Sequence, residues 1–170
     1  VVELLRPVRG GFLRPFRCGW FIREFLLGHG PYGAPAIDPW RGAPQSEIWR
    51  YYKEAIIRET ALDRATRQEE RQSRREKRAI DPERIEALAR RYIKLIPYKT
   101  TSSRYHSFVV YFSDLKRLGW VEETGEIAPS EFQDRYAEGQ PKRYYRLTAA
   151  GKAASDAEWA NPHLALYGRR

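Results

Sequence analysis

The chain has 170 residues, which is enough for one domain with a proper core, or for a small domain with a helical extension. Lys and Arg together number 31 against 22 for Asp and Glu, and the resulting net charge of +9 favours a polyanionic partner. The single cysteine, Cys18, excludes an intramolecular disulfide and a cysteine zinc site, and the longest apolar runs, such as residues 20–22, are too short to span a bilayer. We therefore expect a cytoplasmic protein with no membrane segment.

The chain begins with a basic segment, which precedes a short helix and a loop. Residues 1–15 are expected to form a basic arm, interrupted by Pro and Gly. A helix is predicted over about 16–27, and the Pro- and Gly-rich stretch that follows, as far as Pro44, predicts a loop. We expect Trp40 to fix this loop to the core.

A long helix is predicted next. Ser46 is a suitable N-cap, and apolar residues recur at helical spacing from Ile48 to Leu62. Residues 67–78 contain no apolar side chain, so we expect them to be a projecting helical tip or a solvated linker. If residues 46–78 form one helix, its length is about 50 Å.

A second helix is predicted over residues 82–96, and its first residues indicate where it begins. Asp81 can act as the N-cap, and Pro82 suits the first helical position. The apolar residues of 82–96 then fall on one face of a helix, which Pro97 ends. This helix and residues 46–78 are expected to form an antiparallel hairpin.

A helix from Ser102 or Ser103 to about Leu118 is the segment most suggestive of function. At 100° per residue, Phe108, Phe112 and Leu115 face inward. The outward side carries Ser103, His106, Ser107, Val110, Asp114 and Arg117. Near its N-terminal end this side is small, polar and neutral or basic, which suits a helix that enters the major groove of duplex DNA. Asp114 is the exception, and it lies two turns further along.

Two strands and a last helix complete the chain. Residues 120–123 and 142–148 are predicted to pair as strands, with Tyr145 and Leu147 facing inward. Thr148 is expected to cap a helix that runs to about Ala160, followed by a tail over 161–170. The loop between the strands, of about 18 residues, carries acids that disfavour close phosphate contact at its tip. These acids are Glu123, Glu126, Glu131, Asp134 and Glu138.

Two segments resemble a known family. Residues 114–122, Asp-Leu-Lys-Arg-Leu-Gly-Trp-Val-Glu, resemble the end of the recognition helix and the first wing strand of winged-helix transcriptional regulators of the MarR and PadR kinds. Residues 144–153, Tyr-Tyr-Arg-Leu-Thr-Ala-Ala-Gly-Lys-Ala, resemble their second wing strand and the helix after it. The resemblance covers about 70 residues.

The resemblance implies a mainly α-helical fold with a small β-hairpin, namely a winged helix-turn-helix over 16–160. The family has a short turn between its second and third helices, whereas here a charged helical segment at about 58–81 looks inserted. In a second interpretation, 82–96 is itself the second helix, and 46–78 is the first helix or an added dimerisation helix.

In that family the helix before the wing reads DNA, and the wing touches phosphate or the minor groove. Carried over, this implies a double-stranded DNA-binding regulator that is a homodimer through its N-terminal helices. The implied DNA-binding residues are Lys99, Thr100, Thr101, Ser102, Ser103, Arg104, His106, Ser107, Val110, Arg135, Lys142 and Arg143.

An enzyme is not expected. The three histidines are scattered without metal-ligand spacing, and the sequence has no Gly-rich phosphate loop, nucleophile elbow or CxxC pair. We therefore predict no catalytic residues, no metal and no cofactor. The alternative function is a winged-helix module for protein or RNA contact within a nucleoprotein complex, which the charged hairpin and the acidic wing loop favour.

Overall fold

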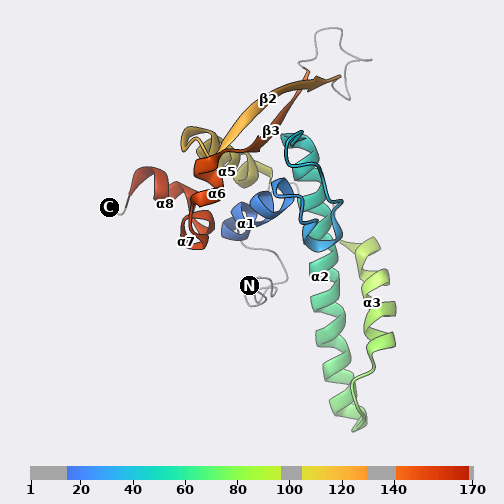
Figure 1. Cartoon of the computed structure of the whole chain (residues 1–170). Coiled ribbons are helices and arrows are strands. Elements are labelled where there is room, and N and C mark those ends of the chain that lie inside the picture. The colour runs from blue at the N-terminus through green and yellow to red at the C-terminus, as the bar shows by residue number, and fades with distance from the viewer. Residues whose placement is uncertain (1–14, 97–104, 130–140, 169–170) are drawn as a thin grey trace. The chain divides into compact units, whose positions relative to one another are not determined.

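The computed structural model describes residues 15–96, 105–129 and 141–168, which are mainly helical with a small antiparallel sheet of three strands (Figure 1). The chain divides into two compact units. The helical unit comprises Val1–Arg14 with Lys53–Arg104, and the sheet unit comprises Pro15–Tyr52 with Tyr105–Arg170. The coarse prediction of a mainly helical fold with a small β element is confirmed.

Three helices build the core of the sheet unit. They are α1 (Pro15–Leu26), the first turns of α2 (Gln45–Glu76) and α5 (Tyr105–Arg117). Aromatic rings join them: the Tyr52 ring centroid lies 5.1 Å from that of Phe21 and 6.1 Å from that of Phe108. Phe108, Phe112 and Leu115 are fully buried, so the predicted inward face of α5 is confirmed.

The sheet has the strand order β1-β3-β2, with both pairings antiparallel. Its strands are β1 (Ala43–Pro44), β2 (Val121–Ala128) and β3 (Lys142–Leu147). The two predicted strands are present, but β2 is longer than expected, so Glu126 lies in a strand rather than in a loop. Strand β1 was not predicted. It pairs with β3 just after Gly42, whose φ of 71° and lack of a side chain permit the close approach to the Tyr145 carbonyl.

The loop that leads to β1 is not fixed by Trp40, so that expectation is wrong. The Trp40 side chain is 75% exposed, and the Arg146 guanidinium lies over its ring at 5.4 Å from the centroid. The pairing of β1 with β3 is what ties this segment, with its short 3-10 helix η2 (Pro31–Gly33), to the sheet.

The single C-terminal helix expected over 149–160 is instead two helices, α6 (Ala149–Ala153) and α7 (Asp156–Ala160). Thr148 caps α6 as predicted, accepting a hydrogen bond from the Gly151 N–H. The helix breaks because Ser155 and Glu158 form a capping box that starts α7. A further helix, α8 (Pro162–Tyr167), occupies most of the predicted tail, and its N-cap is Asn161.

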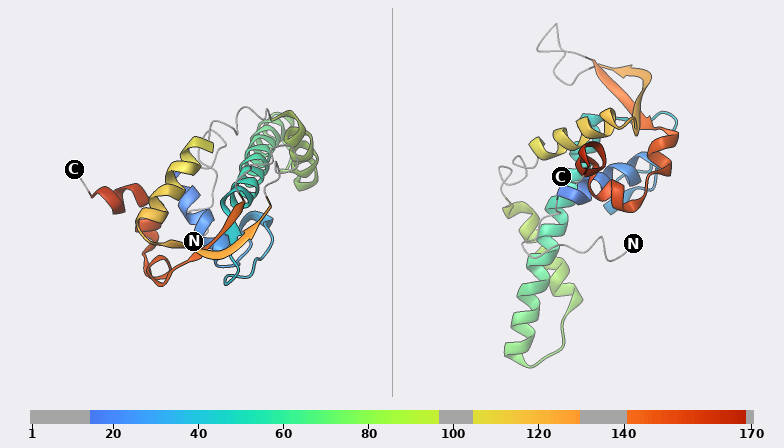
Figure 2. Two further views of the ribbon diagram at one scale, coloured as in Figure 1. Left: turned by 90° about the horizontal axis from the view of Figure 1, so that it is seen from above. Right: turned by 90° about the vertical axis from the view of Figure 1, so that its left-hand side faces the viewer.

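The helical unit contains the rest of α2 and all of α3 (Pro82–Leu95), which lie side by side in both views of Figure 2. Asp81 is the N-cap of α3 as predicted, and it accepts a hydrogen bond from the Glu83 N–H at 3.0 Å. The long helix expected over 46–78 is also present as α2.

The expectation that residues 67–78 are wholly solvated is wrong at two positions. Glu69 and Ser73 are buried, although neither is apolar. The Glu69 carboxylate accepts hydrogen bonds from the Arg78 guanidinium and, at 2.9 Å, from the Asp81 N–H. A buried carboxylate needs such partners, and here they close the turn between α2 and α3.

Candidate nucleic-acid interface

A cleft of about 520 Å³ lies between α5 and the strand β3 in the sheet unit. Val109 of α5 lines one side, and Lys142, Arg143 and Tyr145 of β3 line the other. The predicted residues Lys142 and Arg143 are therefore brought next to the helix that was predicted to read DNA. We call strands β2 and β3 the ribbon; it follows α5 directly in the chain (Figure 1).

α5 is exposed at both ends: around Val110 in its N-terminal half, and at Lys116 and Arg117 in its last turn. Val110 is 41% exposed and Ser107 is half-buried, as an outward face requires. His106 lies in α5, but its side chain is outside the described residues. Lys99 to Arg104 and Arg135 also lie outside the described residues, so the structure does not test their predicted roles.

Asp114 was predicted to face outward, and this is wrong because its side chain is buried. The cause is α8, which packs on this side of α5. His163 Nδ1 lies 3.3 Å from a carboxylate oxygen of Asp114, and the Arg117 guanidinium donates to the Tyr167 hydroxyl at 2.6 Å. The Asp114 side of α5 is thus covered within its own unit, whereas Lys116 and Arg117 in the last turn are exposed.

Acidic and basic side chains alternate across the ribbon and pair with one another. Arg143 lies 3.0 Å from Glu123, and Arg146 lies 2.9 Å from Glu122. A third pair joins Glu126 to Arg41, just before β1, at 2.8 Å. A phosphate that approaches these arginines must compete with a carboxylate already in place.

The two arginines of β3 lie on opposite faces of the ribbon. Successive residues of a strand point to opposite sides, so Arg143 shares the side of Tyr145 and Leu147, and both of these are buried toward the core. Arg146 shares the other side with its cross-strand partner Glu122 and lies over the ring of Trp40. Of these two arginines, Arg143 is therefore the one that lines the cleft beside α5.

Gln45 and Ser46, in the first turn of α2, also line this cleft. The first turn of a helix has backbone N–H groups without helical partners, and these favour anions. Sequence reasoning used Ser46 only as a helix cap and missed this position, because α2 reaches the ribbon through the pairing of β1 with β3.

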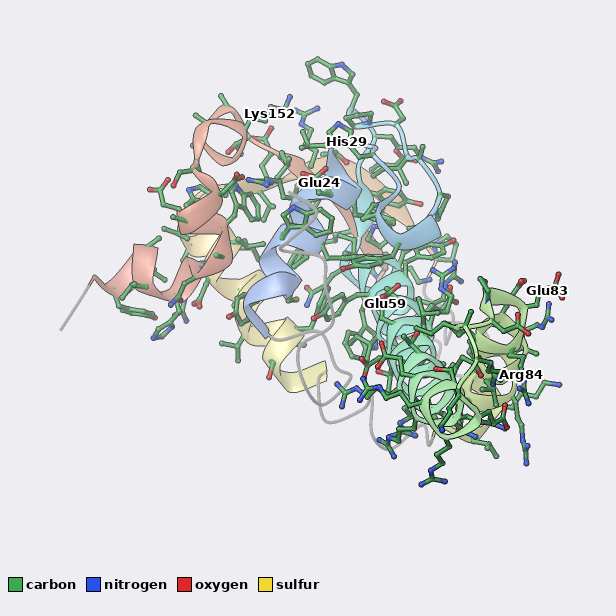
Figure 3. The ribbon with its side chains drawn as sticks, turned by 90° about the horizontal axis from the view of Figure 1, so that it is seen from below. Glu24, His29, Glu59, Glu83, Arg84 and Lys152 are labelled. Atoms are coloured by element: carbon green, nitrogen blue, oxygen red, sulfur yellow. The ribbon has the colours of Figure 1, made fainter. Side chains whose placement is uncertain are left out.

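Histidines are not gathered at a common site in the part of the chain that the structure describes. His29 and Glu24 lie close together at the end of α1 (Figure 3), and His29 Nδ1 is 2.5 Å from the Glu24 carboxylate. His163 pairs with Asp114. Among the described residues no three His, Cys, Asp or Glu side chains are grouped so that they could hold a metal ion.

Comparison of the chain with protein-family models, with characterised proteins and with solved structures gave no match. Of the helices that the structure describes, none combines the length and the apolar character needed to cross a membrane. Statements about function therefore depend on the geometry of the two units.

Proposed function

We propose that the sheet unit is a winged helix-turn-helix domain that binds double-stranded DNA. The N-terminal half of α5 enters the major groove, and the ribbon contacts the phosphate backbone. The observation that carries this proposal is the cleft in which Lys142 and Arg143 lie beside Val109, in the N-terminal half of α5. The order of the elements, a helix followed at once by a two-stranded ribbon, supports it.

As part of the same proposal, the protein is a transcriptional regulator that acts as a homodimer. Two-fold symmetry would present two α5 helices to half-sites about one turn of duplex apart, roughly 34 Å. The expected target is therefore an inverted repeat.

The test measures binding of a fluorescent duplex, selected from a random pool, by anisotropy over a range of salt concentrations. Arg143→Gln should weaken binding and lower the slope of log affinity against log salt by less than about 0.9, the value for one phosphate contact that releases its counterion in full, because Glu123 partly compensates Arg143. Arg146→Gln is the matched control, because Arg146 is also paired with a glutamate of β2 but lies on the other face. Equal effects of the two variants would exclude the cleft as the contact surface.

The second candidate function is contact with RNA or protein inside a nucleoprotein complex. The three acid–base pairs of the ribbon region favour it, because they leave this surface with little net charge for a polyanion. The same assay with a single-stranded RNA decides between the two functions. Tighter binding of the RNA, or no binding of any nucleic acid, supports the second.

A further inference from the structure

A groove of about 650 Å³ lies between α2 and α3, within the helical unit. Its lining is almost entirely polar and charged. Four arginines of α2 and Tyr92 of α3 are its most prominent side chains. The arginines are Arg64, Arg67, Arg71 and Arg75.

These arginines form a stripe along one face of α2, which we call the arginine stripe. Their spacings of three, four and four residues place them on the same side of a helix. Because an α-helix rises about 1.5 Å per residue, the stripe from Arg64 to Arg75 is about 17 Å long.

Within the described residues, most of the arginine stripe has no acidic partner. Arg64, Arg71 and Arg75 are exposed, and no described residue forms an ion pair or side-chain hydrogen bond with them. Arg67 differs, because its guanidinium lies 3.0 Å from the Asp63 carboxylate.

The other acid in the groove is also occupied. Glu76 accepts a hydrogen bond from Arg78 at 2.5 Å, and Arg84 lies 3.7 Å from it. Arg64, Arg71 and Arg75 therefore face the groove without a competing carboxylate from the part of the chain that the structure describes. In the ribbon, by contrast, Arg143 and Arg146 each form an ion pair with a glutamate.

We propose that the arginine stripe binds the phosphate backbone of a nucleic acid, as a second contact surface outside the sheet unit. The guanidinium group presents a planar fork of donors that matches phosphate oxygens. Phosphates of one strand of duplex DNA rise about 3.4 Å each along its axis, and the strand completes a turn in about ten of them, so a straight 17 Å stripe can face about two or three neighbouring phosphates. The contact reads no bases and adds affinity that does not depend on sequence.

The shape of the groove favours an extended polyanion over a small ligand. Small-molecule sites are mostly apolar with a few converging polar groups, whereas this groove has one aromatic side chain and a row of charges. A single phosphate group would need arginines that converge on one point, but Arg64 and Arg75 are three turns of helix apart.

The test uses the full chain and a 24-base-pair duplex of random sequence, so that base reading by α5 contributes nothing. The double variant Arg71→Gln with Arg75→Gln removes two charges of the stripe and keeps good helix formers. The control double variant, Arg90→Gln with Lys94→Gln, removes the same charge from exposed positions on the side of α3 opposite Tyr92. Anisotropy is measured from 0.1 to 0.5 M salt.

The stripe double variant should lower the slope of log affinity against log salt by about 1.8, which corresponds to a roughly sixtyfold loss of affinity at 0.1 M salt. The control should keep the slope of the unmodified protein. Equal losses in the two double variants would mean that only net charge matters, and the proposal would fail. If the unmodified protein binds polyglutamate but no duplex, and the stripe double variant loses this binding, the groove binds an acidic protein instead and the proposal fails.

The inference can fail separately from the proposed function. If Arg143→Gln weakens binding and the stripe double variant does not, the sheet unit binds DNA and the helical unit does not take part. If the stripe variant does not fold, as judged by circular dichroism, the unmodified protein is treated with phenylglyoxal. Bound duplex should then protect Arg71 and Arg75, located by mass spectrometry of peptides, and unchanged modification of both overturns the proposal.

Discussion

Replacement of Glu123 by glutamine tests whether its ion pair with Arg143 weakens the binding of duplex DNA. Glu123 lies 3.0 Å from Arg143, and the two side chains are 48% and 55% exposed. If Arg143 must leave this carboxylate to reach a phosphate, part of the binding energy is lost in breaking the pair. Glu123→Gln removes that loss and also removes a negative charge beside Arg143, so duplex binding should become tighter.

The expected gain in duplex affinity follows from the solvent exposure of the Glu123–Arg143 ion pair. Ion pairs between solvent-exposed side chains contribute about 0.2–1 kcal/mol, and pairs this exposed are screened by water and salt. At 1.4 kcal/mol per factor of ten, the release of Arg143 should raise the affinity for duplex roughly 1.4- to fivefold. The stability of the domain should change by no more than the same amount, so a large fall in the thermal midpoint is not expected.

The assay is duplex anisotropy at several salt concentrations, with Glu122→Gln as the control. Glu122 pairs with Arg146 at 2.9 Å on the other face of the ribbon, so this variant frees an arginine that does not belong to the cleft. We expect Glu123→Gln, but not Glu122→Gln, to bind duplex more tightly and to give a steeper slope of log affinity against log salt. Weaker or unchanged binding by Glu123→Gln, or the same gain in both variants, would refute the reasoning.

Three further predictions concern stability. The hydrogen bond from Arg78 lowers the pKa of Glu69 from the ordinary 4.5 to about 2. The Glu69 carboxylate therefore stabilises the fold above pH 4.5, and this contribution is lost as the pH falls toward 2. Thermal melts of Glu69→Gln should show a weaker pH dependence in that range. Gly42→Ala should destabilise by about 1–3 kcal/mol in urea unfolding, because φ is positive and a methyl group would overlap the backbone of β3. Trp40→Ala should cost less than about 0.5 kcal/mol, against about 3–5 kcal/mol for the fully buried Trp159→Ala, and equal costs would contradict the burial of the two rings.

Features encoded by neighbouring residues could be predicted from the sequence. Asp81 and Pro82 start α3, and Thr148 caps α6, because a cap is defined by a side chain and the backbone two or three residues away. The inward face of α5 followed from helical periodicity, because Phe108 and Phe112 are one turn apart and no polar residue competes for that side.

Features that depend on distant partners could not be predicted. The burial of Asp114 requires α8, which begins 48 positions later, and nothing near Asp114 signals that helix. Strand β1 has only two residues, too few for an alternating pattern, and it exists because β3 lies beside it. Glu69 was expected to be solvated because it is charged, but Arg78 and the turn before α3 supply its partners.

The candidate site was predicted in part for the same reason. Lys142 and Arg143 were predicted because the acids of the loop between the strands disfavour phosphate contact at its tip and leave the base of the loop for that contact, and the structure places them beside α5. The pairing of Arg143 with Glu123 depends on the register of β2 against β3, which shifts between Glu123 and Ile127. A register shift changes which side chains meet across the strands, so composition alone could not give it.

The two basic surfaces differ in how their charge is balanced, and this difference separates their proposed roles. Glu123 already compensates Arg143 in the ribbon, so a phosphate gained there replaces an existing carboxylate and adds little net affinity. Among the described residues no carboxylate pairs with Arg64, Arg71 or Arg75, so each phosphate they bind should release counterions in full. Most of the salt dependence of duplex binding should therefore arise in the helical unit, whereas preference among sequences should arise where Val110 and its neighbours on α5 meet base edges.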